Sequence, residues 1–204
     1  MTKGTVKRRH AVARVPSAAE PRSTTAPDTG ELLLLAARAE FGEHGHSGTD
    51  SNKIARRAGF APQTFYRWYA DKTAIFIAVY QRWETDEYAI LGELVAKGAS
   101  ARRLMNAVVE HHRQHLVFRR SLRRLAVEDD AVRRARAESR LRQIDNIVRL
   151  RRDTSRSLEP AQVAVALLQV ERLADALAEN ELADLGIAEN AARAELISLL
   201  TRLQ

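Results

Sequence analysis

Residues 54–72 read IARRAGFAPQTFYRWYADK, and within them two short helical patterns meet at Gly59. Just upstream, residues 49–52 (TDSN) offer side chains that accept hydrogen bonds from the free N–H groups of a helix start. Gly59 suits the end of that helix because glycine adopts positive φ without a Cβ penalty. Pro62 suits the first turn of the next helix, where its missing N–H costs nothing. The stretch therefore predicts a helix-turn-helix, the unit that lays its second helix in the major groove of DNA.

A longer register of residues surrounds this unit, with fixed order and spacing: Leu33, Leu34, Ala36, Ala37, Phe41, Gly45, Thr49, Ile54, Ala55, Ala58, Gly59, Phe60, Thr64, Phe65, Tyr66 and Lys72. In this register the chain resembles the N-terminal domain of the TetR-type transcriptional regulators, and such a match is more specific than a lone helix-turn-helix. Three positions depart from the family pattern. Glu40 replaces a usual leucine, Ala61 a usual serine N-cap and Gln63 a common glycine. The missing cap should cost about 1 kcal/mol, and Gln63 should change which bases are read.

The recognition helix is predicted over residues 62–69, where the face opposite the apolar Phe65 and Tyr69 carries Gln63, Thr64 and Arg67. Arg67 can pair with a guanine edge, Gln63 with an adenine, and the methyl group of Thr64 can touch a thymine. A phosphate contact, which positions the protein without specifying sequence, is the alternative for Arg67.

Phosphate contacts are implied by the resemblance for Tyr66, through its hydroxyl, and for Lys72 at a helix start. Thr49 and Ser51, at the start of the preceding helix, are expected to meet phosphate on the same principle. The alternatives are a core position for Tyr66 and a solvated Lys72. Trp68 either packs on the backbone or donates its indole N–H to a phosphate.

Composition favours an all-α protein. The chain has 204 residues, of which 45% are hydrophobic and only 5% aromatic, and Ala, Leu, Arg and Glu are abundant. It contains no cysteine, which excludes disulfides and thiolate metal sites. No apolar run is long enough for a membrane span, and the basic N-terminus lacks the apolar core of a signal peptide. We therefore expect a cytoplasmic protein with no membrane partner.

The charge is unevenly distributed. Residues 1–80 carry 12 Lys and Arg against 7 Asp and Glu, whereas residues 171–204 carry 3 against 7. Residues 119–157 add 13 arginines against 6 acids, for which we expect a solvated helix face and keep a second nucleic-acid surface as the alternative. Residues 1–28 have three prolines and no apolar period, so they read as a disordered basic arm that either contacts DNA or acts as a solubilising tail.

Helical periodicity continues to the end of the chain and predicts a helix-turn-helix domain at 29–75 and a helical domain at 76–204. Asp28 or Thr29, Asp71 and Ser100 are placed to cap helices, the second of these helices running on through Trp83. The helix after Ser100 is expected to run through Phe118, with a break following at 128–130. Pro160 begins another helix, and a last one covers 189–203. The last two helices have broad apolar faces. The resemblance implies that they join a twin as a homodimer that binds a palindromic operator; the alternative is that both are internal core.

An effector pocket in the C-terminal helices is also implied by the resemblance, and it makes the protein a repressor that an unknown small molecule releases from DNA. The candidate lining residues are Trp83, Leu104, Met105, Val108, His111, His115 and Phe118. His111 and His115 have the i, i+4 spacing that can chelate a metal, but structural or hydrogen-bonded histidines and polar pocket groups are the competing interpretations.

Two other classes of protein compete with a regulator. One is a helical-bundle metalloenzyme using His111 and His115. It lacks the Glu-x-x-His repeats of di-iron proteins, a glycine-rich phosphate loop and a cysteine nucleophile. The other is a nonspecific architectural DNA-binding protein, suggested by the arginines of residues 119–157. The sequence favours a regulator with no catalytic residues, no metal and no cofactor.

Overall fold

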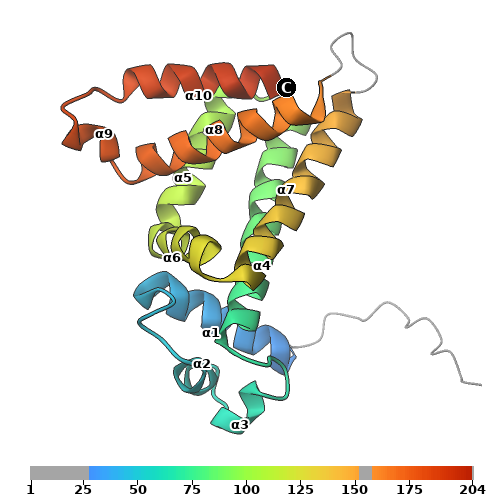
Figure 1. The fold of residues 1–204 in the computed structure, drawn as a ribbon, viewed down its shortest axis with the longest axis vertical. Coiled ribbons are helices and arrows are strands. Elements are labelled where there is room, and N and C mark those ends of the chain that lie inside the picture. The colour runs from blue at the N-terminus through green and yellow to red at the C-terminus, as the bar shows by residue number, and fades with distance from the viewer. Residues whose placement is uncertain (1–27, 152–157, 204) are drawn as a thin grey trace, which may run out of the picture.

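The computed structural model describes residues 28–151 and 158–203, and every regular element within these ranges is a helix (Figure 1). The predicted all-α architecture is confirmed. The expected basic arm lies outside the described residues, apart from Asp28 at its end. The helices are α1 (Thr29–His44), α2 (Ser51–Arg57), α3 (Pro62–Phe65), α4 (Lys72–Ala96), α5 (Ala101–Gln114), α6 (Leu116–Glu128), α7 (Asp130–Arg151), α8 (Pro160–Ala178), α9 (Glu181–Asp184) and α10 (Asn190–Leu203).

Local sequence signals set most of the helix ends. The side chain of Asp28 accepts a hydrogen bond from the Glu31 N–H at 2.9 Å, and that of Asp71 accepts one from the Ala74 N–H at 2.7 Å. Ser100 caps α5 in the same way. Gly59 has φ +81°, as expected of a glycine that ends a helix. These predictions are confirmed because each depends only on contacts within one turn.

Two predicted helices differ from the structure. The helix expected to run from Ser100 through Phe118 is interrupted at His115, whose backbone leaves the helical region at φ −123° and ψ 25°. No glycine or proline marks this break. The recognition helix expected over residues 62–69 is regular only over Pro62–Phe65, and turns continue it to residue 68. Its N-cap, Ala61, makes no side-chain cap hydrogen bond, as the sequence predicted.

The N-terminal helices form a head at the bottom of Figure 1, packed around large buried side chains. Phe41 of α1 meets Phe76 of α4 edge to face, with 5.0 Å between ring centroids. Ile54 of α2 and Phe65 of α3 are fully buried in the same cluster. Phe118 of α6 reaches into it and contacts Phe76. The head is therefore packed against α6 as well as joined to the rest of the molecule by α4.

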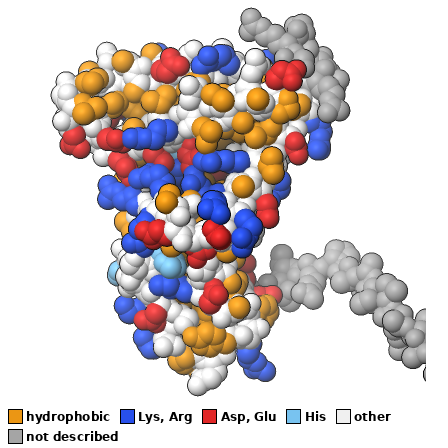
Figure 2. Space-filling view, in the orientation of Figure 1, with side chains coloured by type: hydrophobic (Ala, Val, Ile, Leu, Met, Phe, Trp, Pro, Cys, Tyr) orange, Lys and Arg blue, Asp and Glu red, His pale blue; other side chains and the backbone are white. Residues whose placement is uncertain are grey.

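A second apolar core lies at the other end of the molecule, among α5, α8 and α10. The long helix α4 runs from the head to this end, so one rigid element spans both cores (Figure 1). Figure 2 shows hydrophobic side chains gathered over α8 and α10, and Lys and Arg side chains across the middle of the molecule. Within the described ranges, no helix is long and apolar enough to span a membrane.

Candidate nucleic-acid interface and interior cavity

The end of α3 presents large aromatic and polar side chains to solvent. Phe65 is fully buried and anchors the turn, whereas Tyr66 is 58% exposed and Trp68 50% exposed. Gln63 and Arg67 are also exposed, and Thr64 is half-buried. Exposed large aromatics beside polar groups mark interaction surfaces more often than structural ones. The residues predicted to read bases thus lie on the outer side of the head.

Ser51 and Tyr66 are brought together by the packing of α2 on α3. Their hydroxyl oxygens lie 2.8 Å apart at hydrogen-bond distance, and the pair is exposed. Ser51 is the first residue of α2, where backbone N–H groups are free to meet an anion. The two hydroxyls therefore form one polar position next to Arg67, although they are 15 residues apart in sequence.

Thr49 does not present its side chain to solvent. It is only 4% exposed, and its hydroxyl donates a 2.7 Å hydrogen bond to Glu40. A phosphate contact from this hydroxyl, expected from the sequence, does not fit the structure, because the hydroxyl is buried and donates its hydrogen bond to the Glu40 carboxylate.

The loop before α2 holds the tip of the Lys72 side chain. Its ammonium group donates hydrogen bonds to the carbonyl oxygens of His46, at 2.7 Å, and Thr49, at 3.0 Å. Partial burial lowers the pKa of Lys72. The side chain thus fixes the position of the α2 N-terminus, whatever further contact its charge makes.

Glu40, the residue in a usual leucine position, forms a buried polar connection between α1 and α2. Its carboxylate accepts the Thr49 hydrogen bond and pairs with Arg57 at 3.1 Å, while Arg57 also pairs with Glu43. Burial opposes ionisation of Glu40, but the hydrogen bonds from Thr49 and Arg57 outweigh it and hold its pKa below the ordinary value. The carboxylate is therefore a structural link inside the head.

Trp68 packs on the first turn of α1 while half of its surface stays exposed. A Cβ atom on Gly30 would lie only 2.5 Å from the indole ring, so the ring rests against the α1 backbone. The backbone-packing interpretation of Trp68 thus has direct support, and its exposed part extends the surface of Tyr66 and Arg67.

A cavity of about 640 Å³, partly open to solvent, lies between the long helices of the C-terminal part. Side chains from α4, α5, α6, α7, α8 and α10 line it. The volume is typical of a small-molecule site. Its aliphatic walls include Leu91, Val95, Leu104, Val108, Ile147 and Leu200.

Of the residues that the sequence suggested for a pocket, Trp83, Leu104 and Val108 line this cavity. The other four lie elsewhere: Met105 is buried in the second core, Phe118 in the head cluster, and His111 and His115 pack beside Trp83. The histidine at the cavity is His112 instead, which sequence reasoning missed.

The charged floor of the cavity is a buried ionic cluster joining α5, α6, α7 and α8. Asp175, 2% exposed, accepts hydrogen bonds from Arg119, at 2.9 Å and 3.1 Å, and is bonded to His112 at 2.8 Å. Arg119 also donates to Glu171 at 3.0 Å and lies over the Trp83 ring, 4.9 Å from its centroid. The expectation of a solvated face is wrong for Arg119, because acids of α8 draw it inward.

Two pKa values follow from this cluster. Burial opposes ionisation of Glu171, but the nearby guanidinium groups of Arg119, Arg136 and Arg140 outweigh it and lower its pKa to about 2. Burial also disfavours a charged His112, yet hydrogen bonds to Asp175 and Glu87 raise its pKa above the ordinary value. Burial thus opposes the charged forms of Glu171 and His112, and their ionic and hydrogen-bond partners favour those forms.

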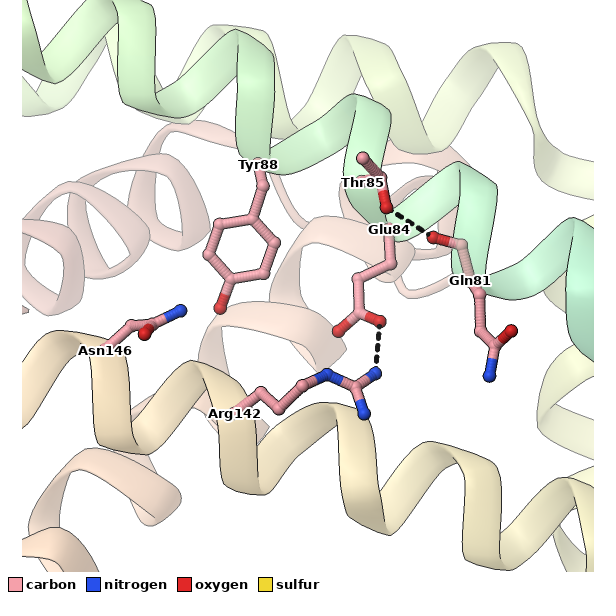
Figure 3. A pocket seen from close by; sticks show the side chains of 6 residues that line it. All are labelled: Gln81, Glu84, Thr85, Tyr88, Arg142 and Asn146. Atoms are coloured by element: carbon pink, nitrogen blue, oxygen red, sulfur yellow. Dashed lines mark hydrogen bonds and ion pairs between the residues drawn. The ribbon is translucent and has the colours of Figure 1, made fainter. Parts of the chain in front are cut away.

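A polar groove of about 420 Å³ lies beside the cavity, between α4 and α7 (Figure 3). Arg142 donates a 3.2 Å hydrogen bond to Glu84, and the Tyr88 phenol points toward Asn146. Burial raises the pKa of Glu84. Tyr88 lines both the groove and the apolar cavity, so the two spaces adjoin at this side chain.

Within the described ranges, no group of three His, Asp or Glu side chains is placed to hold a metal ion. His111 and His115 have ring centroids 4.8 Å apart, and Nδ1 of His115 lies 2.8 Å from the His111 carbonyl oxygen. That contact turns one His115 nitrogen toward the helix backbone.

Comparisons with known proteins agree with this architecture. Residues 33–79 match the family model described as bacterial regulatory proteins, tetR family. No curated protein matches the sequence. Similar solved structures include a chain from Rhodococcus sp. assigned to the TetR-family transcriptional regulators, with 22% identity over 86% of this chain and 97% of that one and a TM-score of 0.67.

Two further structures have the same fold. A TetR-like transcriptional regulator from Rhodococcus sp. RHA1 is 23% identical over 87% of this chain and 97% of its own, with a TM-score of 0.55. The fatty acid degradation regulator FadR from Bacillus halodurans is 16% identical over 87% and 96%, with a TM-score of 0.59. Residues 33–79 therefore carry the sequence signature of the tetR family of bacterial regulatory proteins, and the chain has the fold of solved TetR-family regulators over 86–87% of its length.

Proposed function

We propose that this DNA-binding regulator is a homodimeric repressor, which binds an approximately palindromic operator and leaves it when a small molecule fills the cavity. The observation that carries the proposal is the exposed surface at the end of α3. There, Tyr66 and Arg67 stand on a buried Phe65, and Ser51 lies at hydrogen-bond distance from Tyr66. A surface of this composition, on the second helix of a helix-turn-helix, fits the major groove.

The contacts divide into two kinds. Gln63, Thr64 and Arg67 read base edges, because amide, methyl and guanidinium groups match adenine, thymine and guanine. Ser51 and Tyr66 hold a phosphate between their hydroxyls and the N-terminus of α2. Lys72 acts chiefly by fixing the loop before α2, since two carbonyl groups already occupy its ammonium.

The outer faces of α8 and α10 support the proposed homodimer. Val165 and Leu168 of α8 are 56% and 48% exposed, and the adjoining face of α10 exposes small residues at Ala194 and Ser198. Small side chains let two helices approach closely, and exposed Val and Leu gain from burial against a twin. Two subunits related by a two-fold axis present two α3 surfaces, so the DNA site should be approximately palindromic.

Effector release is supported by the two elements that connect the cavity to the head. α4 carries Phe76 in the head core and Trp83 at the cavity. α6 carries Phe118 in the head core and Arg119 at the cavity floor. A ligand that binds the cavity better when these helices are in an arrangement that does not fit the operator shifts the separation of the two heads, and operator affinity falls accordingly.

The test begins with selection of bound duplexes from a random library, followed by anisotropy titrations of the selected and a scrambled duplex. A repressor of this kind prefers the selected site by ~10³-fold at physiological salt and yields a palindrome. Arg67→Ala should relax preference at one base pair by about 1–3 kcal/mol, whereas Tyr66→Phe should weaken all duplexes alike. The matched control is Arg113→Ala, an exposed arginine on α5.

Equal affinity for scrambled DNA would instead favour the architectural protein, and stoichiometric metal in the purified protein would favour the metalloenzyme. If Arg67→Ala weakens binding to all duplexes equally, Arg67 contacts phosphate, and its assignment as a base reader is contradicted.

A further inference from the structure

The charged side chains around the cavity already have interaction partners. Glu87 contacts His112 at 3.3 Å, and His112 contacts Asp175 on its other nitrogen. Arg119 and Arg140 both pair with Glu171. Arg151, at the end of α7, also has an interaction partner. The side chains that could neutralise a charged ligand in this space are therefore already paired with other protein groups.

The uncharged polar groups of the lining are engaged too, with the exception of the buried Trp83 indole N–H, which has no hydrogen-bond partner. The Tyr80 hydroxyl donates to Ser139 at 2.9 Å, and the Gln143 amide donates to Glu84 at 3.2 Å. Tyr88 points toward Asn146 in the adjoining groove (Figure 3). Of these three, Tyr88 is the one that also faces the polar groove, and it is 37% exposed.

Breaking one of these pairs to accommodate an ionic ligand is unfavourable. Removing one partner from a buried ion pair leaves an uncompensated charge, and that cost generally exceeds the attraction gained. An uncharged molecule leaves the pairs intact and gains by burying hydrocarbon against Leu91, Leu104 and Val108.

From this pairing we infer that the effector is an uncharged, mainly hydrocarbon molecule with at most one hydroxyl or carbonyl group, and that this group lies at Tyr88. The inference rests on the proposed effector role of the cavity and specifies the ligand class. The hydrocarbon part fills the space between α4, α5, α7 and α8, while the single polar group reaches the groove that contains Glu84 and Arg142.

Three probes of equal chain length test the ligand class: dodecanol, dodecanoate and dodecylammonium, each below its micelle-forming concentration. The chain has two tryptophans, Trp68 and Trp83, so Trp68→Phe leaves Trp83 as a fluorescence reporter in the cavity wall. Dodecanol should bind at least ten-fold more tightly than either ion. Equal or tighter binding of dodecanoate or dodecylammonium overturns the inference.

Two variants test the physical reason. Glu171→Gln removes the carboxylate that Arg119 and Arg140 share, so dodecanoate should gain affinity relative to dodecanol by ten-fold or more. Leu167→Phe narrows the cavity and should weaken dodecanol binding. Unchanged dodecanol affinity in this variant places the ligand elsewhere and overturns the inference. Should Glu171→Gln fail to fold, the ranking of the three probes in the Trp68→Phe protein still decides the question.

Operator release, measured by anisotropy with the unmodified protein, separates the two proposals. If dodecanol binds best but leaves operator affinity unchanged, the ligand class stands and release by the cavity ligand fails. If dodecanoate binds best and releases DNA, the proposed function stands and the ligand class is wrong. If none of the probes alters Trp83 fluorescence, the inferred ligand class is contradicted.

Discussion

Replacing Asp175 by alanine removes the central acceptor of the buried ionic cluster. The carboxylate is 2% exposed and is bonded to His112 at 2.8 Å, to Arg119 at 2.9 Å and to Arg123 at 2.8 Å. Breaking a buried pair typically costs about 3–5 kcal/mol because a charge is left without its partner. Arg119 and His112 keep second acceptors in Glu171 and Glu87. The lower end of the range therefore applies, and we expect a loss of about 3 kcal/mol in the free energy of unfolding.

Denaturant unfolding monitored by circular dichroism, at fixed protein concentration, measures this loss. In a thermal scan it corresponds to a fall of roughly 6–12 °C for a chain of this size. The control is Glu181→Ala, which breaks an ion pair to Arg172 with side-chain exposures of 42% and 61% and should cost less than about 1 kcal/mol. If both variants lose the same small amount, the cluster does not stabilise the fold as argued.

Three further predictions concern the head and the pH dependence of stability. Ala61→Ser supplies the missing N-cap of α3 and should raise the free energy of unfolding by about 1 kcal/mol; no gain in a urea titration would mean that the turn cannot accept the cap. Glu40→Leu restores an apolar residue at a buried position and should change stability by less than about 1 kcal/mol, since a buried pair is often replaceable by a hydrophobic group; a loss above about 2 kcal/mol would show a net-stabilising carboxylate. The folded-state pKa of Glu171 is about 2, below its ordinary 4.5, so its contribution is present above pH 4.5 and is lost as pH falls toward 2. The stability difference between the wild type and Glu171→Gln should shrink over that window, and a difference independent of pH would contradict the assignment.

Sequence alone predicted the features that depend on neighbouring residues. Asp28, Asp71 and Ser100 cap their helices, and Gly59 follows the end of α2 with positive φ. The helical segment is interrupted at Asp129, between α6 and α7. Each of these outcomes is set by hydrogen bonds or dihedral preferences within about one helical turn. The exposure of Gln63 and Arg67 opposite a buried Phe65 follows from helical spacing in the same way.

What the sequence could not supply depends on contacts between distant segments. Thr49 turns inward because Glu40 is in reach across the α1–α2 turn, which spacing alone does not reveal. The histidine stripe of α5 was assigned to a pocket, but His111 and His115 face Trp83 of α4, while the next position, His112, meets Asp175 of α8. Glu171, the shared partner of Arg119, Arg136 and Arg140, lies 31 or more residues from each of them in sequence. The sequence contains one indication of these ion pairs: residues 171–204 have an excess of acidic residues, and residues 119–157 have an excess of arginines.

The central claim, that the end of α3 docks on DNA, is tested most directly by oxidative footprinting of the protein with and without a bound duplex. Tyr66 and Trp68, which are 58% and 50% exposed in the free protein, should become strongly protected when DNA binds. Leu141 of α7, 60% exposed and outside the head, should react at the same rate in both states. Unchanged oxidation of Tyr66 and Trp68 in a fully bound complex would contradict the account.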